Sequence, residues 1–155
     1  MRKAVRAIVF KDNNLLVMKR NKFGNEFYTL VGGGIDAGES AEQALLREVM
    51  EEAGIEIADL KLVFIEEAGE PFGTQYVYLA RYLSGEPALD ESSEEMAITK
   101  LGQNLYQPVW LPVAELPNIV MLSENLKQAI IKGMSDNFVG DAKTILSGIN
   151  LGYNS

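Results

Sequence analysis

The segment from residue 39 to residue 54, ESAEQALLREVMEEAG, constrains the fold most, because it carries the strongest helix signal in the chain. It has no Gly or Pro before its last position, Ser40 is a suitable N-cap, and Gly54 is a suitable C-terminal stop. At about 100° per residue, glutamates fall on one face of this helix and apolar residues on the opposite, wider sector. The glutamates are Glu48, Glu51 and Glu52, and the apolar residues are Leu45, Leu46, Val49, Met50 and Ala53. The pattern predicts a helix that packs its apolar face and presents carboxylates outward.

Strand signals occur on both sides of this helix. They lie at residues 4–10, 15–20, 26–31, 58–69 and 74–83, and at 106–117 a short strand is followed by a turn or short helix. A second helix is predicted at 123–134, with Leu126, Ala129 and Ile130 on one side. This order predicts an α/β fold of the α+β kind, with helices packed on a mixed sheet. The length of 155 residues predicts one domain over residues 1–155.

Two segments are predicted to be loops. Residues 32–40, GGGIDAGES, are rich in glycine, and residues 84–104 are polar and acidic. A loop as long as the second one is usually functional or mobile in a compact domain. The tail from Asp136 has scattered glycines, and no element is assigned to it.

The composition excludes several kinds of chemistry. The chain has no His and no Cys, so a zinc, copper or iron–sulfur site and Ser-His-Asp or Cys-His catalysis are not expected. A metal site would have to use carboxylates, carbonyls and water, which suit Mg²⁺, Mn²⁺ or Ca²⁺. The absence of disulfides suits the cytoplasm, which is the predicted location. No apolar run is long enough for a membrane span, and the N-terminus resembles a first strand more than a signal peptide.

Negative charge is concentrated around the predicted helix. The net charge is −8, and residues 33–55 hold six acidic residues and one basic residue, which together give −5. Such a surface repels a nucleic-acid duplex, and no basic stripe is present, so duplex binding is not expected. Like charges three or four residues apart each destabilise a helix by roughly 0.2–0.5 kcal/mol. A divalent cation among the carboxylates would remove that repulsion.

The acidic helix face and the glycine-rich segment before it each have an ordinary explanation as well. A charged helix face by itself is usually a solvated surface, and a glycine-rich segment by itself is usually a tight turn. Here the glycines lead directly into the helix, and glycines allow a backbone to approach a phosphate or a metal closely. The two features together therefore favour a binding site.

Residues 33–55 resemble the Nudix box at every specified position. The box has a Gly, a Glu after five residues, Arg-Glu-aliphatic after seven more, then Glu-Glu and Gly-aliphatic at fixed spacing. The matching residues are Gly33, Glu39, Arg47, Glu48, Val49, Glu51, Glu52, Gly54 and Ile55. The resemblance implies the Nudix α/β/α sandwich with a mixed β-sheet. It also implies Mg²⁺- or Mn²⁺-dependent hydrolysis of a small molecule in which a nucleoside diphosphate is linked to another group.

The resemblance assigns roles to particular residues. In the family, the box glutamates hold the metals, often with the carbonyl of the preceding glycine. The box Arg usually orients a glutamate, and the first box Glu supports the loop near the metals. The implied metal ligands are Gly32, Glu48, Glu51 and Glu52, and the implied catalytic set adds Arg47 and Glu39. Many relatives form dimers, so a homodimer is one possible assembly, and the sequence leaves the oligomeric state open.

The general base and the substrate contacts stay open. Family members use either a box glutamate or one from a distant loop, and Glu94 and Glu95 are candidates here, although plain solvated charge also explains them. Basic residues could meet phosphates and aromatic residues could stack on a base, but solubility and strand packing explain them too. These candidates are Lys19, Arg20 and Lys22, and Tyr28, Phe72, Tyr76 and Tyr78, with Arg20 and Tyr28 as the weak substrate assignments.

The substrate class also stays open. Pro71 lies sixteen residues after Ile55, a spacing typical of the ADP-ribose branch of the family, but a turn at residues 70–73 explains it without a substrate. Nucleoside triphosphates, ADP-ribose and sugar nucleotides all fit. Two other hypotheses remain: a catalytically silent nucleotide-sensing module, and a calcium-binding structural module that uses the acidic residues 86–95, for which no EF-hand spacing is present.

Overall fold

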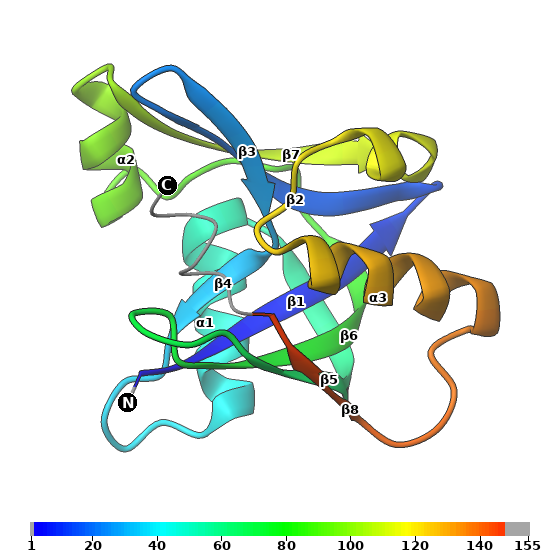
Figure 1. Cartoon of the computed structure of the whole chain (residues 1–155). Helices are drawn as coiled ribbons and strands as arrows, with labels where there is room; N and C mark the ends of the chain where they lie inside the picture. Colours follow the sequence, from blue (N-terminus) through cyan, green and yellow to red (C-terminus); the bar gives the residue numbers. More distant parts are fainter. Residues whose placement is uncertain (1, 148–155) are drawn as a thin grey trace.

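A computed structural model describes residues 2–147 of the chain (Figure 1). Within these residues it contains strands, α-helices and one 3₁₀-helix. The strands are β1 (Lys3–Lys11), β2 (Asn14–Lys22), β3 (Asn25–Thr29), β4 (Val31–Gly34), β5 (Glu56–Glu67), β6 (Thr74–Ser84), β7 (Asn104–Pro112) and β8 (Lys143–Leu146). The helices are α1 (Ala41–Ala53), α2 (Glu94–Lys100), the 3₁₀-helix η1 (Val113–Asn118) and α3 (Glu124–Asp136).

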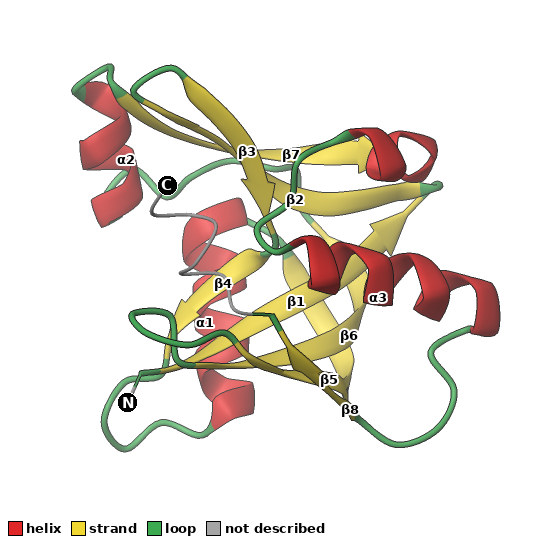
Figure 2. Cartoon of the chain, viewed as in Figure 1, coloured by secondary structure: helices red, strands yellow, loops and turns green. Residues whose placement is uncertain are grey.

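The strands form one mixed sheet among the described residues. Its order is β3-β2-β1-β6-β5-β8, with β4 also paired to β1 and β7 also paired to β2. The pairs β1·β6 and β5·β8 are parallel, and the other pairs are antiparallel. Helix α1 lies on one side of the central strands and α3 on the other (Figure 2). The predicted mixed sheet with helices on both faces is therefore confirmed.

Each face of the sheet has its own hydrophobic core. On the α1 side, Leu16 and Val49 are fully buried, and Ile55 is nearly so. On the α3 side, Ile8 and Ile130 are fully buried. Burial of apolar surface in these two layers is what holds the helices on the sheet. None of the helices between residues 2 and 147 is long and apolar enough to span a membrane.

Helix α1 begins and ends where the sequence predicts. The hydroxyl of Ser40 accepts a hydrogen bond from the backbone N–H of Gln43, at 3.1 Å, and the side chain of Gln43 accepts one from the N–H of Ser40, at 2.9 Å. This reciprocal capping box satisfies two N–H groups that a helix start leaves without partners. Gly54 ends the helix in the left-handed conformation, with φ 64°, which glycine adopts without steric cost.

The prediction of which face of α1 is buried was wrong in part. Leu45 and Val49 are fully buried as expected, but Leu46 and Met50 are 46% and 48% exposed. Glu52, predicted to face outward, is only 7% exposed. The cause is the neighbouring strand: α1 packs beside β4, whose three glycines have no side chains, so the edge of the helix that carries Glu52 comes close to the sheet.

Two predicted loops contain regular structure instead. Residues 32–34 belong to β4, because without a side chain Gly32 can lie against β1: a Cβ there would stand 1.9 Å from the carbonyl oxygen of Val5. Residues 94–100 of the acidic segment form α2, which is capped by Ser93 through a 3.0 Å hydrogen bond from the N–H of Met96.

The tail from Asp136, to which no element was assigned, contains β8, which adds a parallel strand to β5. Residues 148–155 of this tail lie outside the described part of the chain.

Candidate active site

A cleft of about 600 Å³ opens between α1, β4, α2 and the start of α3. Acidic side chains from three elements line it together with basic and aromatic side chains. The acidic residues are Glu48, Glu52, Glu66, Glu94 and Glu95; the basic ones are Arg2, Arg6, Arg20 and Lys22; the aromatic ones are Phe27, Phe72 and Tyr106. A cleft with both charges and apolar walls suits an anionic organic molecule with associated cations.

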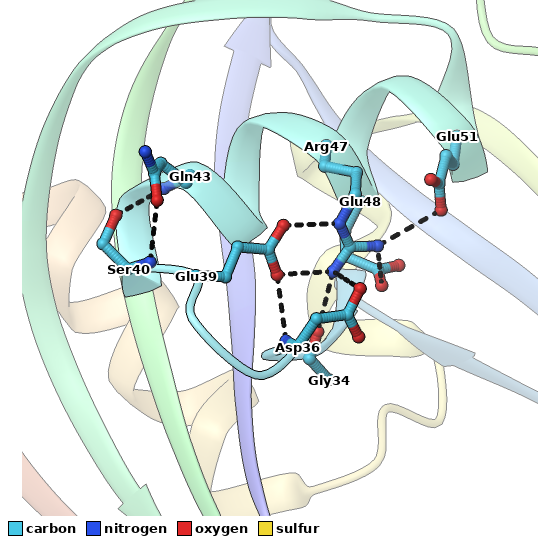
Figure 3. Close-up of polar contacts among 8 residues, drawn as sticks. All are labelled: Gly34, Asp36, Glu39, Ser40, Gln43, Arg47, Glu48 and Glu51. Atoms are coloured by element: carbon cyan, nitrogen blue, oxygen red, sulfur yellow. Dashed lines mark hydrogen bonds and ion pairs between the residues drawn. The ribbon is translucent and has the colours of Figure 1, made fainter.

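Arg47 lies at the centre of the carboxylates on α1 and the preceding loop (Figure 3). Its Nε and Nη2 donate to both oxygens of Glu39, at 2.6 and 2.9 Å. Its Nη1 donates to Glu48 Oε1 at 2.8 Å and to Glu51 Oε2 at 3.3 Å, and Nη2 also donates to the carbonyl of Gly34 at 3.1 Å. One guanidinium therefore ties the loop, the end of β4 and the glutamate face of α1 together.

Glu39 is held as an anion by these contacts. The Arg47 guanidinium and then the backbone N–H of Asp36, at 2.9 Å, lower the pKa of Glu39 to about 2. The same pairing with Glu39 raises the pKa of Arg47. This pair fixes the loop that leads into the helix, as the Nudix resemblance implies for the first box glutamate.

Glu52 has the opposite electrostatic environment. Burial raises the pKa of Glu52 to about 8, against the attraction of Arg6 and a hydrogen bond of 3.2 Å from the N–H of Gly32. Glu95 and Glu48 add repulsion that raises this pKa further. Burial also raises the pKa of Glu48, against the contact with Arg47. The two carboxylates that face the cleft are thus costly to ionise without a nearby positive charge.

The glycines of β4 make room for these carboxylates. A Cβ at Gly33 would stand 2.5 Å from Cδ and Oε2 of Glu48, so a side chain there would displace the carboxylate. A Cβ at Gly34 would meet nothing within 4 Å. The space for Glu48 therefore depends on glycine at position 33 and not at position 34.

The donor set fits a divalent cation such as Mg²⁺. No three acidic side chains between residues 2 and 147 converge into a ready-made cage. Mg²⁺ does not need one, because proteins usually hold it with one or two carboxylates, waters and substrate phosphates. Glu48 and Glu52 supply two hard oxygen donors in a place where negative charge is already unfavourable.

The remaining predicted residues separate into those that line the cleft and those that do not. Glu94 and Glu95 line it from α2, and Arg20 and Lys22 line it from β2. Glu51 is not among the lining residues; its side chain is 47% exposed and pairs with Arg47.

The candidate aromatic residues divide in the same way. Phe72 lines the cleft beside Pro71. Tyr28 lies outside the lining and packs against the core on the α3 side. Tyr76 and Tyr78 pack in the core on the α1 side, as the strand-packing alternative predicts.

Sequence reasoning did not find several residues of the cleft. One of them is Arg6, which donates to Gln75 Oε1 at 2.9 Å and to the carbonyl of Leu30 at 3.2 Å. Another is Tyr106, whose ring centre lies 3.6 Å from the guanidinium of Arg20, a predicted candidate. Arg6 lies within the predicted apolar strand at residues 4–10, and for that reason it was not identified as a site residue. The available signal was a charged residue at an inward position of that strand, two residues before Ile8.

Residues 1–131 match the family model of the NUDIX domain. This match covers most of the chain, and it agrees with the box at residues 33–55 and with the helix-flanked mixed sheet. The chain therefore belongs to the Nudix family.

Individual relatives are similar over different lengths. A NAD-capped RNA hydrolase, NudC, of Escherichia coli O1:K1 is 34% identical over 80 residues, which are 52% of this chain and 31% of NudC, so the match spans about a third of that relative. The crystal structure of a MutT NUDIX hydrolase from Burkholderia pseudomallei is 27% identical, with a TM-score of 0.54 over 72% of this chain and 82% of that one. An ADP-ribose pyrophosphatase from Streptococcus suis shares the fold, with 19% identity and a TM-score of 0.63 over 94% and 98% of the two chains.

Replacing Gly33 by Ala is expected to displace the Glu48 carboxylate without unfolding the protein, because the clash is with the end of a flexible side chain. Mg²⁺ affinity, measured by calorimetry, should fall by about 10- to 100-fold, the usual effect of disturbing the residues around a metal site. Gly34→Ala is the matched control and should bind Mg²⁺ as the wild type does. Equal affinities in the two variants would contradict the role given to Gly33.

The stability of the protein in a chelator should depend on pH through Glu52. The pKa of Glu52 in the folded protein, about 8, lies above its ordinary value of 4.5. The contribution of protonated Glu52 to the free energy of unfolding is therefore complete below pH 4.5 and is lost as the pH rises through 8. The free energy of unfolding should fall by up to about 1.4 kcal/mol per pH unit in this range. Glu52→Gln should remove that slope and exposed Glu42→Gln should keep it, as measured by urea denaturation. A slope unchanged in Glu52→Gln would show that Glu52 is not the titrating group.

Proposed function

We propose that this protein is a Mg²⁺- or Mn²⁺-dependent hydrolase that cleaves a phosphoanhydride bond in a nucleotide-type small molecule. The observation that carries the proposal is the pair Glu48 and Glu52. They lie one turn apart on α1, they line a cleft beside the glycine backbone of β4, and their ionised forms are destabilised by burial. A divalent cation is the partner that would relieve this destabilisation.

The residues around the pair have complementary roles. A bound Mg²⁺ or Mn²⁺ neutralises phosphate oxygens and lowers the pKa of water. Arg47 keeps Glu48 oriented, and the N–H of Gly32 keeps Glu52 oriented. The carbonyl of Gly32 remains a proposed ligand. Arg20 supplies positive charge on the α2 side of the cleft for a phosphate group of the substrate.

Glu95 is the proposed proton acceptor for the attacking water. It lies on α2 at the cleft, opposite the carboxylates of α1, and its charge contributes to the raised pKa of Glu52. Because Glu48 and Glu52 are assigned to the cation, a carboxylate from a different element is free to accept the proton. Glu51, which pairs with Arg47 at the edge of the site, is proposed to support the ligands.

The substrate class follows from the charge of the cleft and from what the relatives are named for. Those relatives include a NAD-capped RNA hydrolase, a MutT hydrolase and an ADP-ribose pyrophosphatase. The first and the third of these names contain a substrate with a nucleoside joined through a phosphoanhydride bond. Nucleoside triphosphates, ADP-ribose and sugar nucleotides are therefore the proposed set, and a nucleic-acid duplex is not. One domain over residues 1–155, a homodimer and a cytoplasmic location remain predictions.

The proposal is tested by product release from nucleoside triphosphates, ADP-ribose, dinucleoside polyphosphates and sugar nucleotides, each with Mg²⁺ or Mn²⁺. Wild type should turn over at least one class, and Glu52→Gln should reduce kcat/KM by at least ~100-fold, since it removes a proposed ligand rather than a supporting group. Glu42→Gln, exposed on the same helix, is the matched control and should be unaffected.

Two results would contradict the proposal. Full turnover by Glu52→Gln would disprove the assigned site. Nucleotide binding without turnover on every substrate would support the silent sensing module instead.

A further inference from the structure

A second buried carboxylate lines the cleft away from α1. Glu66, on β5, is only 2% exposed, although it is one of the residues that line the cavity. It lies where β5, β6 and the start of α3 meet. Neither the Nudix box nor the proposed cation site accounts for an acidic residue at this position.

One oxygen of Glu66 is held in place by α3. The hydroxyl of Ser123, the N-cap of α3, donates to Glu66 Oε2 and accepts a hydrogen bond of 3.2 Å from the N–H of Leu126. Ser123 is itself buried, with 7% of its surface exposed. The cap of α3 therefore fixes the orientation of the carboxylate.

The hydrogen bond from Ser123 occupies only one of the carboxylate's acceptor positions, on Oε2. Arg6 interacts electrostatically with Glu66, but its guanidinium donates hydrogen bonds to Gln75 Oε1 and to the carbonyl of Leu30. A carboxylate offers about four acceptor positions on its two oxygens, so Glu66 keeps the capacity to accept a further hydrogen bond. Since Glu66 lines the cleft, a bound molecule can supply the donor.

Glu66 lies at a suitable distance from the proposed cation site to contact the base of a nucleotide. Strand β5 is separated from β4 by β6 and β1, which is three strand spacings, or roughly 14 Å across the sheet. Phosphates beside Glu48 and Glu52 would therefore leave the nucleoside to extend along the cleft toward β5.

The walls beside Glu66 fit the flat, apolar faces of a base. Phe72, Leu122 and Leu126 all line the cleft. Apolar side chains around one fixed hydrogen-bonding group form the usual pattern of base recognition.

We propose that Glu66 is a specificity-determining residue that accepts a hydrogen bond from an amino group on the base of the bound nucleotide. The inference rests on the proposed function, whose substrate class it narrows. An ionised carboxylate only accepts hydrogen bonds, so a carbonyl oxygen at the same position of the base would face another acceptor. Amino-bearing bases are therefore selected over their oxo counterparts.

The test is equilibrium binding of nucleoside monophosphates with Mg²⁺, because these contain no phosphoanhydride bond and cannot be turned over. AMP and IMP, and CMP and UMP, differ by an amino or oxo group at one position of the ring. Wild type should bind the amino member of at least one pair at least ~10-fold more tightly. In Glu66→Gln, whose amide can donate or accept and can still bond to Ser123, that ratio should fall to near one.

Glu67→Gln is the matched control. Glu67 is the next residue on β5 and so points to the opposite face of the sheet, where it accepts from Thr74 at 3.1 Å. It should keep the wild-type ratio. Equal affinities within both pairs in wild type, or a preference that survives in Glu66→Gln, would overturn this inference. Turnover of the substrate panel would still stand in either case, so the two proposals fail separately.

Discussion

The close packing of β4 between β1 and α1 is the constraint on which the site depends. A side chain at Gly32 would collide with the backbone of Val5, and one at Gly33 would collide with the carboxylate of Glu48. Without side chains, the strand can pair with β1 while the edge of α1 that carries Glu48 and Glu52 comes close to it. The glycines therefore position the carboxylates through the space they leave, in addition to offering backbone groups.

The acidic residues of this region are not equivalent, and their differences follow from their neighbours. Glu39 and Glu51 pair with Arg47 at the edge of the site and hold the loop and the helix together. Glu52 is buried, accepts one backbone hydrogen bond and lies near two other carboxylates, so its ionised form needs a further positive charge. Arg47 therefore stabilises the loop and the helix, and the carboxylates of Glu48 and Glu52 face the cleft.

The sequence predicted the parts that depend on local pattern. The caps of α1 at Ser40 and Gly54 and the mixed sheet are confirmed, and the family follows from the spacing within residues 33–55. The orientation of Glu52 could not be predicted from the helix alone, because it depends on the glycine strand that packs beside it. Helix α2 was missed because its segment is polar and acidic. Strand β8 was missed because four residues in a tail with scattered glycines are too few to give a strand pattern. Glu66 was missed because its site exists only when β5, β6 and α3 meet.

The most direct test of the proposed site is to locate Mn²⁺ in crystals of the protein by its anomalous scattering. Mn²⁺ prefers the same oxygen ligands as Mg²⁺. The expected result is a cation bound to carboxylate oxygens of both Glu48 and Glu52, beside the backbone of β4. Mn²⁺ bound elsewhere, or a site that keeps the cation in Glu52→Gln with unchanged ligands, would contradict the assignment.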